Sequence, residues 1–258
     1  MHQSPGFIVA IPARHGSTRL PGKPLQLLAG EPLVRHVVRR GLDSGAGSVV
    51  VATDDTRVAA VLSDLPVQVC MTDAALASGS DRLAEASRQC GWADDAIVVN
   101  LQGDEPFAPL SGIAAVVDAL REDEAPMATL ATPLRHVEEL FDPNCVKLVR
   151  DQRGRALYFS RAPLPWARDA LAHSRRELPA QVPLLRHIGL YAYRAGFLRR
   201  FAALPRTPLE QAESLEQLRA LEHGWPIAVR LAPEPFPPGI DTPEDLARAE
   251  QVLVGAGA

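Results

Sequence analysis

The chain has 258 residues, 47% of them hydrophobic, and a formal net charge of −4. This is enough to bury the core of one large α/β domain or of two small ones. The mild acidity argues against nucleic acid as a partner, because duplex-binding proteins normally carry a basic face. The three cysteines are scattered without metal-binding spacing, and no apolar run approaches the length of a membrane span. We therefore expect a cytoplasmic protein with no zinc site and no membrane association.

Short apolar runs alternate with amphipathic helical patterns through the first half of the chain. The predicted strands are Phe7–Ile11, Ser48–Thr53, Val67–Met71 and Ala96–Leu101. The predicted helices are Leu33–Ser44, Thr56–Leu62, Ser80–Cys90 and Ser111–Asp123. This alternation predicts an α/β fold with a mostly parallel central sheet and helices on both faces. Ligands bind such sheets at the carboxyl ends of strands, where the loops 12–23 and 102–106 are expected.

The second half of the chain is less regular. The predicted strands are Met127–Pro133, Val146–Arg150, Ala156–Phe159, His187–Arg194 and Pro226–Leu231. A long excursion over 162–183 is expected to contain one short helix near 167–177. The predicted helices are Leu209–His223 and a final one that starts at Thr242, with Pro243 at its first position and Asp245 completing the cap. Because no linker or repeat is visible, we expect one domain over 1–258, with a smaller lobe around 127–224.

The loop after the first strand has the most informative composition in the chain. Arg14, Arg19 and Lys23 lie within ten residues together with glycines and hydroxyls, and no acidic residue precedes Glu31. Backbone N–H groups and cationic side chains in such a loop are suited to hold a polyphosphate. The loop matches neither the P-loop nor the dinucleotide-binding pattern. The alternative interpretation is an ordinary solvated basic loop.

Four aspartates stand at the boundaries of predicted strands and helices. Asp104 follows a buried strand and Asp241 precedes a capped helix, and hard oxygen ligands of this kind suit Mg²⁺. Without further information Asp104 could equally be a turn residue, and Asp241 a residue favoured near a helix N-terminus. Asp54 and Asp55 end a predicted strand, and we interpret both as helix-capping residues.

Eight sequence blocks, in order, resemble the sugar-acid cytidylyltransferases from about Phe7 to Leu253. They are Pro12–Leu25, Val51–Asp55, Ser78–Arg82, Val99–Pro106, Tyr158–Arg161, Arg186–Tyr191, Leu215–Arg219 and Gly239–Leu246. The resemblance is strongest to the members that act on 3-deoxy-D-manno-octulosonate (Kdo). It implies a Rossmann-like nucleotidyltransferase fold and transfer of CMP from CTP to Kdo, which gives CMP-Kdo and pyrophosphate for lipopolysaccharide biosynthesis. It also implies Mg²⁺ as cofactor, a sugar-binding and dimerisation role for the lobe, and a homodimer.

The resemblance also implies roles for individual residues. The implied catalytic residues are Arg14, Lys23, Asp104 and Asp241, of which both aspartates would bind the same Mg²⁺. The implied nucleotide-binding residues are Pro12, Ala13, Arg14, Ser17, Arg19, Lys23, Ser78, Gly79, Arg82 and Gln102. The implied sugar-acid-binding residues are Gln102, Arg161, His187, Tyr191, Glu216 and Gln217.

Simpler interpretations stay open for several of these residues. Arg82 could be an ordinary residue of a first helical turn, Tyr191 a core residue and His187 a structural histidine. The sequence also departs from the family before the Ser-Gly pair, where Leu76 stands in place of a histidine. Two functional alternatives remain: a cytidylyltransferase for another sugar acid, such as neuraminate or amino-Kdo, and a nucleotide-binding regulatory module without turnover.

Overall fold

The computed structural model describes residues 6–16 and 19–256. The chain forms two compact units. Unit 1 comprises Met1–Ala114, Tyr193–Ala202 and Phe236–Ala258, and unit 2 comprises Ala115–Ala192 and Ala203–Pro235. Most of the lobe expected around 127–224 thus falls in unit 2, although its residues 193–202 belong to unit 1. The prediction of a single domain stays a prediction.

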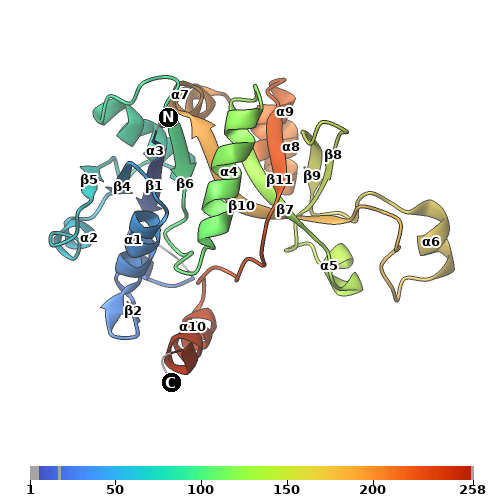
Figure 1. Cartoon of the computed structure of the whole chain (residues 1–258), viewed down its shortest axis with the longest axis horizontal. Coiled ribbons are helices and arrows are strands. Elements are labelled where there is room, and N and C mark those ends of the chain that lie inside the picture. Colours follow the sequence, from blue (N-terminus) through green and yellow to red (C-terminus); the bar gives the residue numbers. More distant parts are fainter. Residues whose placement is uncertain (1–5, 17–18, 257–258) are drawn as a thin grey trace, which may run out of the picture. The chain divides into compact units, whose positions relative to one another are not determined.

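Unit 1 is built on a parallel sheet of four strands in the order β6-β1-β4-β5 (Figure 1). The strands are β1 (Ile8–Ala13), β4 (Ser48–Thr53), β5 (Gln68–Met71) and β6 (Ile97–Asn100). The apolar side chains of β1, β4 and β6 are buried almost without interruption, as in a sheet covered on both faces, whereas Met71 of the edge strand β5 is exposed. The associated helices are α1 (Leu33–Asp43), α2 (Thr56–Ala60), α3 (Gly79–Gln89) and α7 (Ala195–Ala203), and α4 (Leu110–Glu122) begins in this unit.

A second small core in unit 1 joins residues 20–33 to residues 240–253. The 3₁₀ helix η1 (Lys23–Leu25) leads into a short hairpin, β2 (Leu27–Leu28) and β3 (Glu31–Pro32). The last helix, α10 (Pro243–Ala256), packs against this region. The buried members of the cluster are Leu20, Leu28, Leu33, Ile240 and Ala249. Apolar burial therefore brings residues just before α10 close to the loop that follows β1.

Unit 2 contains parallel and antiparallel strand pairs. Strand β11 (Ile227–Leu231) pairs in parallel with β7 (Met127–Pro133), and the long strand β10 (Leu185–Arg194) pairs with the antiparallel hairpin strand β8 (Lys147–Arg150). Strand β9 (Ala156–Ser160) completes the hairpin. The helices are α5 (Val137–Phe141), α6 (Arg168–His173), α8 (Pro208–Glu213) and α9 (Gln217–Glu222).

The predicted fold class is confirmed, and all predicted strands are present within a few residues. The prediction of one helix over 209–223 is wrong. Ser214 adopts a left-handed conformation with φ of 51°, which ends α8 and turns the chain before α9. The sequence analysis also missed the hairpin β2–β3 and the helices α5 and α7. In the part of the chain that the structure describes, no helix is long and apolar enough to span a membrane.

Candidate active site

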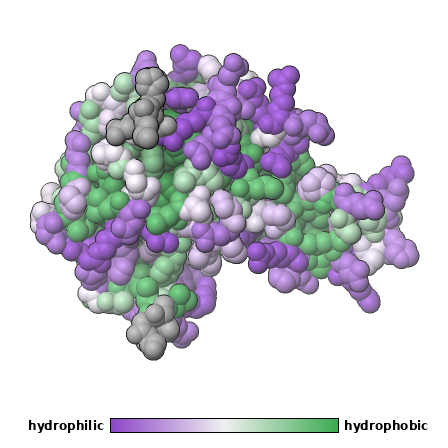
Figure 2. All heavy atoms as spheres, viewed as in Figure 1, coloured by the Kyte–Doolittle hydropathy of each residue, from purple (hydrophilic) through white to green (hydrophobic). Residues whose placement is uncertain are grey.

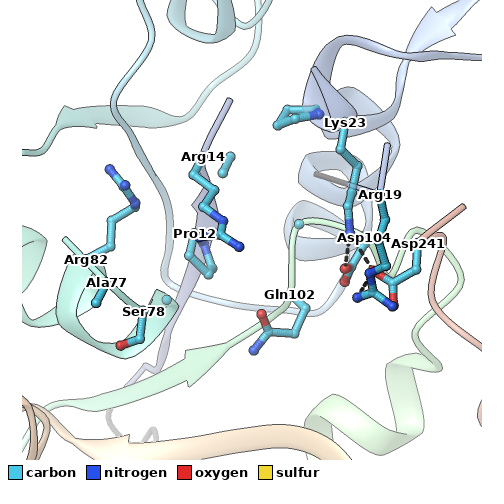
Figure 3. Close-up of a pocket in the computed structure, with 14 residues that line it drawn as sticks. Pro12, Arg14, Arg19, Lys23, Ala77, Ser78, Arg82, Gln102, Asp104 and Asp241 are labelled. Carbon is cyan, nitrogen blue, oxygen red and sulfur yellow. Dashed lines mark hydrogen bonds and ion pairs between the residues drawn. The ribbon is translucent and has the colours of Figure 1, made fainter. Parts of the chain in front are cut away.

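Eleven of the predicted nucleotide-site and metal-site residues line one cavity of about 270 Å³ in unit 1 (Figure 3). They are Pro12, Ala13, Arg14, Arg19, Lys23, Ser78, Gly79, Arg82, Gln102, Asp104 and Asp241. Lys23, Arg19 and both aspartates lie at one end of the cavity in Figure 3, whereas Ser78 and Arg82 lie at the other. Ser17, the remaining predicted nucleotide-binding residue, lies outside the described residues. The binding role of these side chains stays a prediction.

The cations at the first wall come from the loop between β1 and η1. Gly22 caps η1 with a left-handed φ of 64°, and Pro24 occupies the first turn, where a missing N–H costs nothing. Lys23 is consequently held at the start of a short helix and is 16% exposed. Arg14 is exposed and forms no ion pair within the described part of the chain. This wall therefore offers one fixed ammonium and one guanidinium open to an anion.

The ammonium of Lys23 joins the two predicted metal ligands. Its Nζ donates to Asp104 Oδ2 and to Asp241 Oδ1, both at 2.7 Å, and Arg19 also pairs with Asp241 at 2.9 Å. Burial disfavours the charged form of Lys23, but both carboxylates outweigh this effect and raise its pKa. Residues 137 positions apart in the sequence thus face the same point in the cavity.

Backbone contacts explain why Asp241 reaches Asp104. The N–H of Ile240, a buried residue of the second small core, donates to the carbonyl of Asp104 at 2.8 Å. The next residues form the predicted cap of α10, since Asp245 N donates to Thr242 Oγ1 and Asp245 Oδ2 accepts from the N–H of Asp241. Asp241 is therefore fixed between a core residue and a capped helix.

Glu105 is an ionisable group that the sequence analysis did not include in the site. Its Oε2 atom is buried and has no hydrogen-bond partner in the described structure. Burial, reinforced by the negative charges of Asp104 and Asp241, raises the pKa of Glu105 to about 8. At neutral pH this side chain is thus mostly a neutral acid, and it adds little to the negative charge beside the two aspartates.

The second wall is the N-terminus of α3. Ser78 caps this helix in a reciprocal capping box with Asp81. The guanidinium of Arg82 is only 2% exposed, donates to Thr72 Oγ1 at 2.5 Å and pairs with Asp54 at 3.0 Å. Arg82 therefore combines a position in the pocket wall with a buried structural ion pair. Where the family has a histidine, Leu76 is half-buried and Ala77 lines the cavity.

The floor of the cavity is a close approach of two chain segments. A Cβ atom on Gly103 would lie 2.7 Å from the carbonyl oxygen of Pro12, and one on Gly79 would lie 3.3 Å from the Pro12 ring. A larger residue at position 103 would push the two segments apart. Gln102 lies next to this contact, between the two ends of the pocket (Figure 3).

The other predicted sugar-binding residues belong to unit 2. Arg161 is held by its Nε, which donates to the Glu213 carbonyl at 2.7 Å, and by its NH1, which donates to the Pro143 carbonyl at 2.8 Å. The Glu213 carboxylate accepts from Ser160 Oγ at 2.5 Å and from the Arg161 N–H at 2.9 Å. Glu213, the last residue of α8, therefore fixes the end of β9.

His187 and Tyr191 lie near each other along β10, with ring centroids 5.4 Å apart. His187 Nε2 lies 3.1 Å from Thr129 Oγ1, whose single proton is directed to the carbonyls of Ile188 and Leu190. His187 Nε2 is therefore the donor in this pair. Burial lowers the pKa of His187 to about 3, so the ring is uncharged at neutral pH. An uncharged imidazole is better suited to form a hydrogen bond with a substrate hydroxyl than to bind a carboxylate.

Glu216 and Gln217 stand at the start of α9. Gln217 is 5% exposed, and its Nε2 has no hydrogen-bond partner among the residues described. Glu216 lies 3.8 Å from Arg219. An unpartnered buried amide is rare in native proteins, and it marks this position as one where a ligand hydroxyl could accept a hydrogen bond.

Comparison with known proteins gives a consistent result. The sequence model of the family described as "Cytidylyltransferase" matches residues 8–230. A protein of Stenotrophomonas maltophilia named 3-deoxy-manno-octulosonate cytidylyltransferase is 64% identical over 253 residues, which cover 98% of either chain. A protein of Xanthomonas euvesicatoria with the same name is 62% identical over 245 residues and 95% of either chain.

Solved structures agree with these relatives. The structure of CMP:2-keto-3-deoxy-manno-octonic acid synthetase in complex with CTP has a TM-score of 0.88 and 38% identity, covering 98% of this chain and 100% of that one. A 4-diphosphocytidyl-2C-methyl-D-erythritol synthase has a TM-score of 0.63 at 14% identity, covering 97% of this chain and 99% of that one, and so shares the fold alone.

Proposed function

Since the chain belongs to the cytidylyltransferase family, we propose that it transfers CMP from CTP to Kdo and releases pyrophosphate. The observation that carries this proposal is the arrangement of Lys23, Asp104 and Asp241 at one end of a cavity whose other end is the N-terminus of α3. The names of the nearly full-length relatives and the CTP complex of the similar structure support both substrates. The product would serve lipopolysaccharide biosynthesis.

The reaction asks the protein mainly for positioning and charge. The anomeric hydroxyl of the sugar acid attacks the α-phosphorus of CTP, a new phosphorus–oxygen bond forms, and the bond to the pyrophosphate leaving group breaks. Arg14, Arg19 and Lys23 would bind the triphosphate, and Lys23 would stabilise the charge that develops on the leaving group. Ser78, Gly79 and Arg82, at the N-terminus of α3 in the same pocket, would bind the cytidine.

The chemistry of the two aspartates fits Mg²⁺. Their carboxylate oxygens already share one cation, the Lys23 ammonium, so the space between them suits a positive charge. In the part of the chain described, no cluster of three or more His, Cys, Asp or Glu side chains forms a metal site. Two carboxylates plus substrate oxygens and waters are the usual ligands of Mg²⁺. Asp104 and Asp241 would hold the ion, which when bound would neutralise phosphate charge.

In unit 2, the predicted sugar-binding residues already described would contact the sugar acid. The Arg161 side chain supplies positive charge for a carboxylate, whereas neutral His187, Tyr191 and the unpartnered amide of Gln217 suit hydroxyl groups. Glu216 would accept from a further hydroxyl. This division of roles favours a polyhydroxylated sugar acid as the acceptor.

A panel of substrates tests the proposal. Purified protein should release pyrophosphate only when CTP, Kdo and a Mg²⁺ salt are all present, and replacing CTP by UTP should abolish most of the activity. Kdo, neuraminate and amino-Kdo should be compared as acceptors under the same conditions. Turnover with neuraminate equal to that with Kdo would refute the assignment of the acceptor. CTP binding without any turnover would favour the regulatory module.

We also propose that the enzyme is a homodimer of the cytoplasm. The three cysteines are free thiols, as expected in a reducing compartment. Large apolar side chains of unit 2 are exposed, and Figure 2 shows hydrophobic surface around α5 and α6. The exposed residues are Phe141, Leu157, Trp166, Leu209 and Leu231. Sedimentation velocity should give about twice the chain mass, and a monomer at micromolar concentration would contradict the proposal.

A further inference from the structure

Asp54 contacts both walls of the nucleotide pocket without lining it. Its Oδ1 accepts from the backbone N–H of His15, in the loop after β1, at 3.1 Å. Its Oδ2 pairs with the guanidinium of Arg82, on α3, at 3.0 Å. The Asp54 side chain is 12% exposed and that of Arg82 is 2% exposed. The next residue, Asp55, instead caps α2, and its Oδ2 lies 3.8 Å from Nδ1 of the His15 ring. Of these two aspartates, it is Asp54 that also pairs with Arg82.

The end of β4 makes further contacts with the same two walls. Thr53 Oγ1 donates to the carbonyl of Ala13 at 2.6 Å, and the carbonyl of Thr53 accepts from Thr72 Oγ1 at 3.1 Å. Thr72 Oγ1 in turn accepts from Arg82 at 2.5 Å. These contacts form a network in which Asp54 supplies the negative charge that compensates the buried guanidinium.

The bond to His15 also restrains the loop that carries the cations. His15 directly follows Arg14, and its ring lies against Gly22, where an added Cβ would be 3.3 Å from the ring Nε2. Gly22 directly precedes Lys23 and has a left-handed backbone conformation. The His15 backbone is thus held at Asp54 while its ring lies against the residue before Lys23. A change at Asp54 would disturb Arg14, Lys23 and Arg82 together.

We propose that Asp54 is a positioning residue that fixes the two walls of the pocket at the spacing needed for CTP. This inference rests on the proposed function, because it takes CTP as the ligand. We expect no contact between Asp54 and the substrate, because Asp54 acts through Arg82 and through the loop at His15. Loss of one hydrogen bond to a charged group changes binding by about ten- to a hundredfold, which sets the scale of the expected effect.

The test is calorimetric titration of CTP into Asp54→Asn and Asp54→Glu, well below their melting temperatures. Asn keeps the size of the side chain but loses the charge beside Arg82. Glu keeps that charge, and with it the fold, but its longer side chain displaces the carboxylate. Both variants should bind CTP at least about tenfold more weakly than the wild type. The KM for CTP should rise by a similar factor, with a smaller change in the KM for Kdo.

The matched control is Asp123→Asn, which removes a partly buried ion pair with Arg155 in unit 2. It should lower the melting temperature but leave the affinity for CTP within about twofold of the wild type. Equal weakening of CTP binding in this control would reduce Asp54 to a structural role and overturn the proposal. Wild-type affinity in either Asp54 variant would also overturn it. Failure of the wild type itself to bind CTP would refute the proposed function instead.

Discussion

Replacing Asp104 or Asp241 by Asn should lower kcat for pyrophosphate release by at least about a hundredfold, the scale of losing one positioned electrostatic group. Both carboxylates lie 2.7 Å from Lys23 Nζ. Each variant therefore leaves a single carboxylate at a site where two are expected to bind the metal. Asn keeps the size of the side chain and one oxygen, and both residues lie outside regular elements. The fold should therefore survive.

The activity of these variants should be measured across a range of Mg²⁺ concentrations. If the aspartates bind the ion, each Asn variant should need more Mg²⁺ to reach half of its maximal rate. Glu244→Gln provides a control, because Glu244 is exposed in the first turn of α10, three residues beyond Asp241. It should behave as the wild type. Near-normal turnover of an Asn variant at limiting Mg²⁺ would remove that residue from the metal site.

Replacing Lys23 by Ala should lower kcat by about a hundredfold or more while the KM for CTP changes much less. The reason is that an ammonium fixed beside the leaving group interacts more strongly with the charge that develops during the reaction than with bound CTP. Steady-state kinetics with CTP as the varied substrate measures both constants. A higher KM with unchanged kcat would make Lys23 a binding group that treats substrate and transition state alike.

Lys23→Arg adds a sharper version of this test. The chain has 27 Lys and Arg residues, of which only Lys23 and Lys147 are lysines. Each ammonium group donates to two oxygens: Lys23 to the two aspartates, and Lys147 to the Asp142 carbonyl at 2.7 Å and to the Cys145 carbonyl at 2.5 Å. A planar guanidinium cannot replace a compact charge between two carboxylates. Lys23→Arg should therefore not restore the activity lost in Lys23→Ala.

The alternation of apolar and amphipathic segments was sufficient to predict the parallel sheet and the loop that carries Arg14, Arg19 and Lys23. The meeting of Asp104 with Asp241 was expected only from the family resemblance. The contacts that bring them together are the backbone hydrogen bond from Ile240 to Asp104 and the Lys23 ammonium that both aspartates share. Ile240 is buried in a core that includes the unpredicted hairpin β2–β3. Local sequence patterns contain no information on such a long-range contact.

Other features were missed because they depend on tertiary contacts. Asp54 and Asp55 both follow β4, and capping is a reasonable prediction for either, yet only Asp55 caps α2. The break between α8 and α9 lies at Ser214, whose left-handed conformation follows Glu213, and the Glu213 carboxylate bonds to Ser160 of β9 in a tertiary contact. Glu105 was not included in the predicted site, because its burial beside the two aspartates cannot be predicted from its position in the sequence.

A crystal structure with CTP and Mn²⁺ in place of Mg²⁺ would test the central claim most directly. The claim is that one pocket of unit 1 holds the nucleotide, with its triphosphate and metal at the end marked by Lys23 and the two aspartates. The predicted result is an anomalous manganese peak in contact with both Asp104 and Asp241, and a triphosphate bound by Arg14, Arg19 and Lys23. A metal that contacts neither aspartate, or CTP bound outside this pocket, would contradict the account.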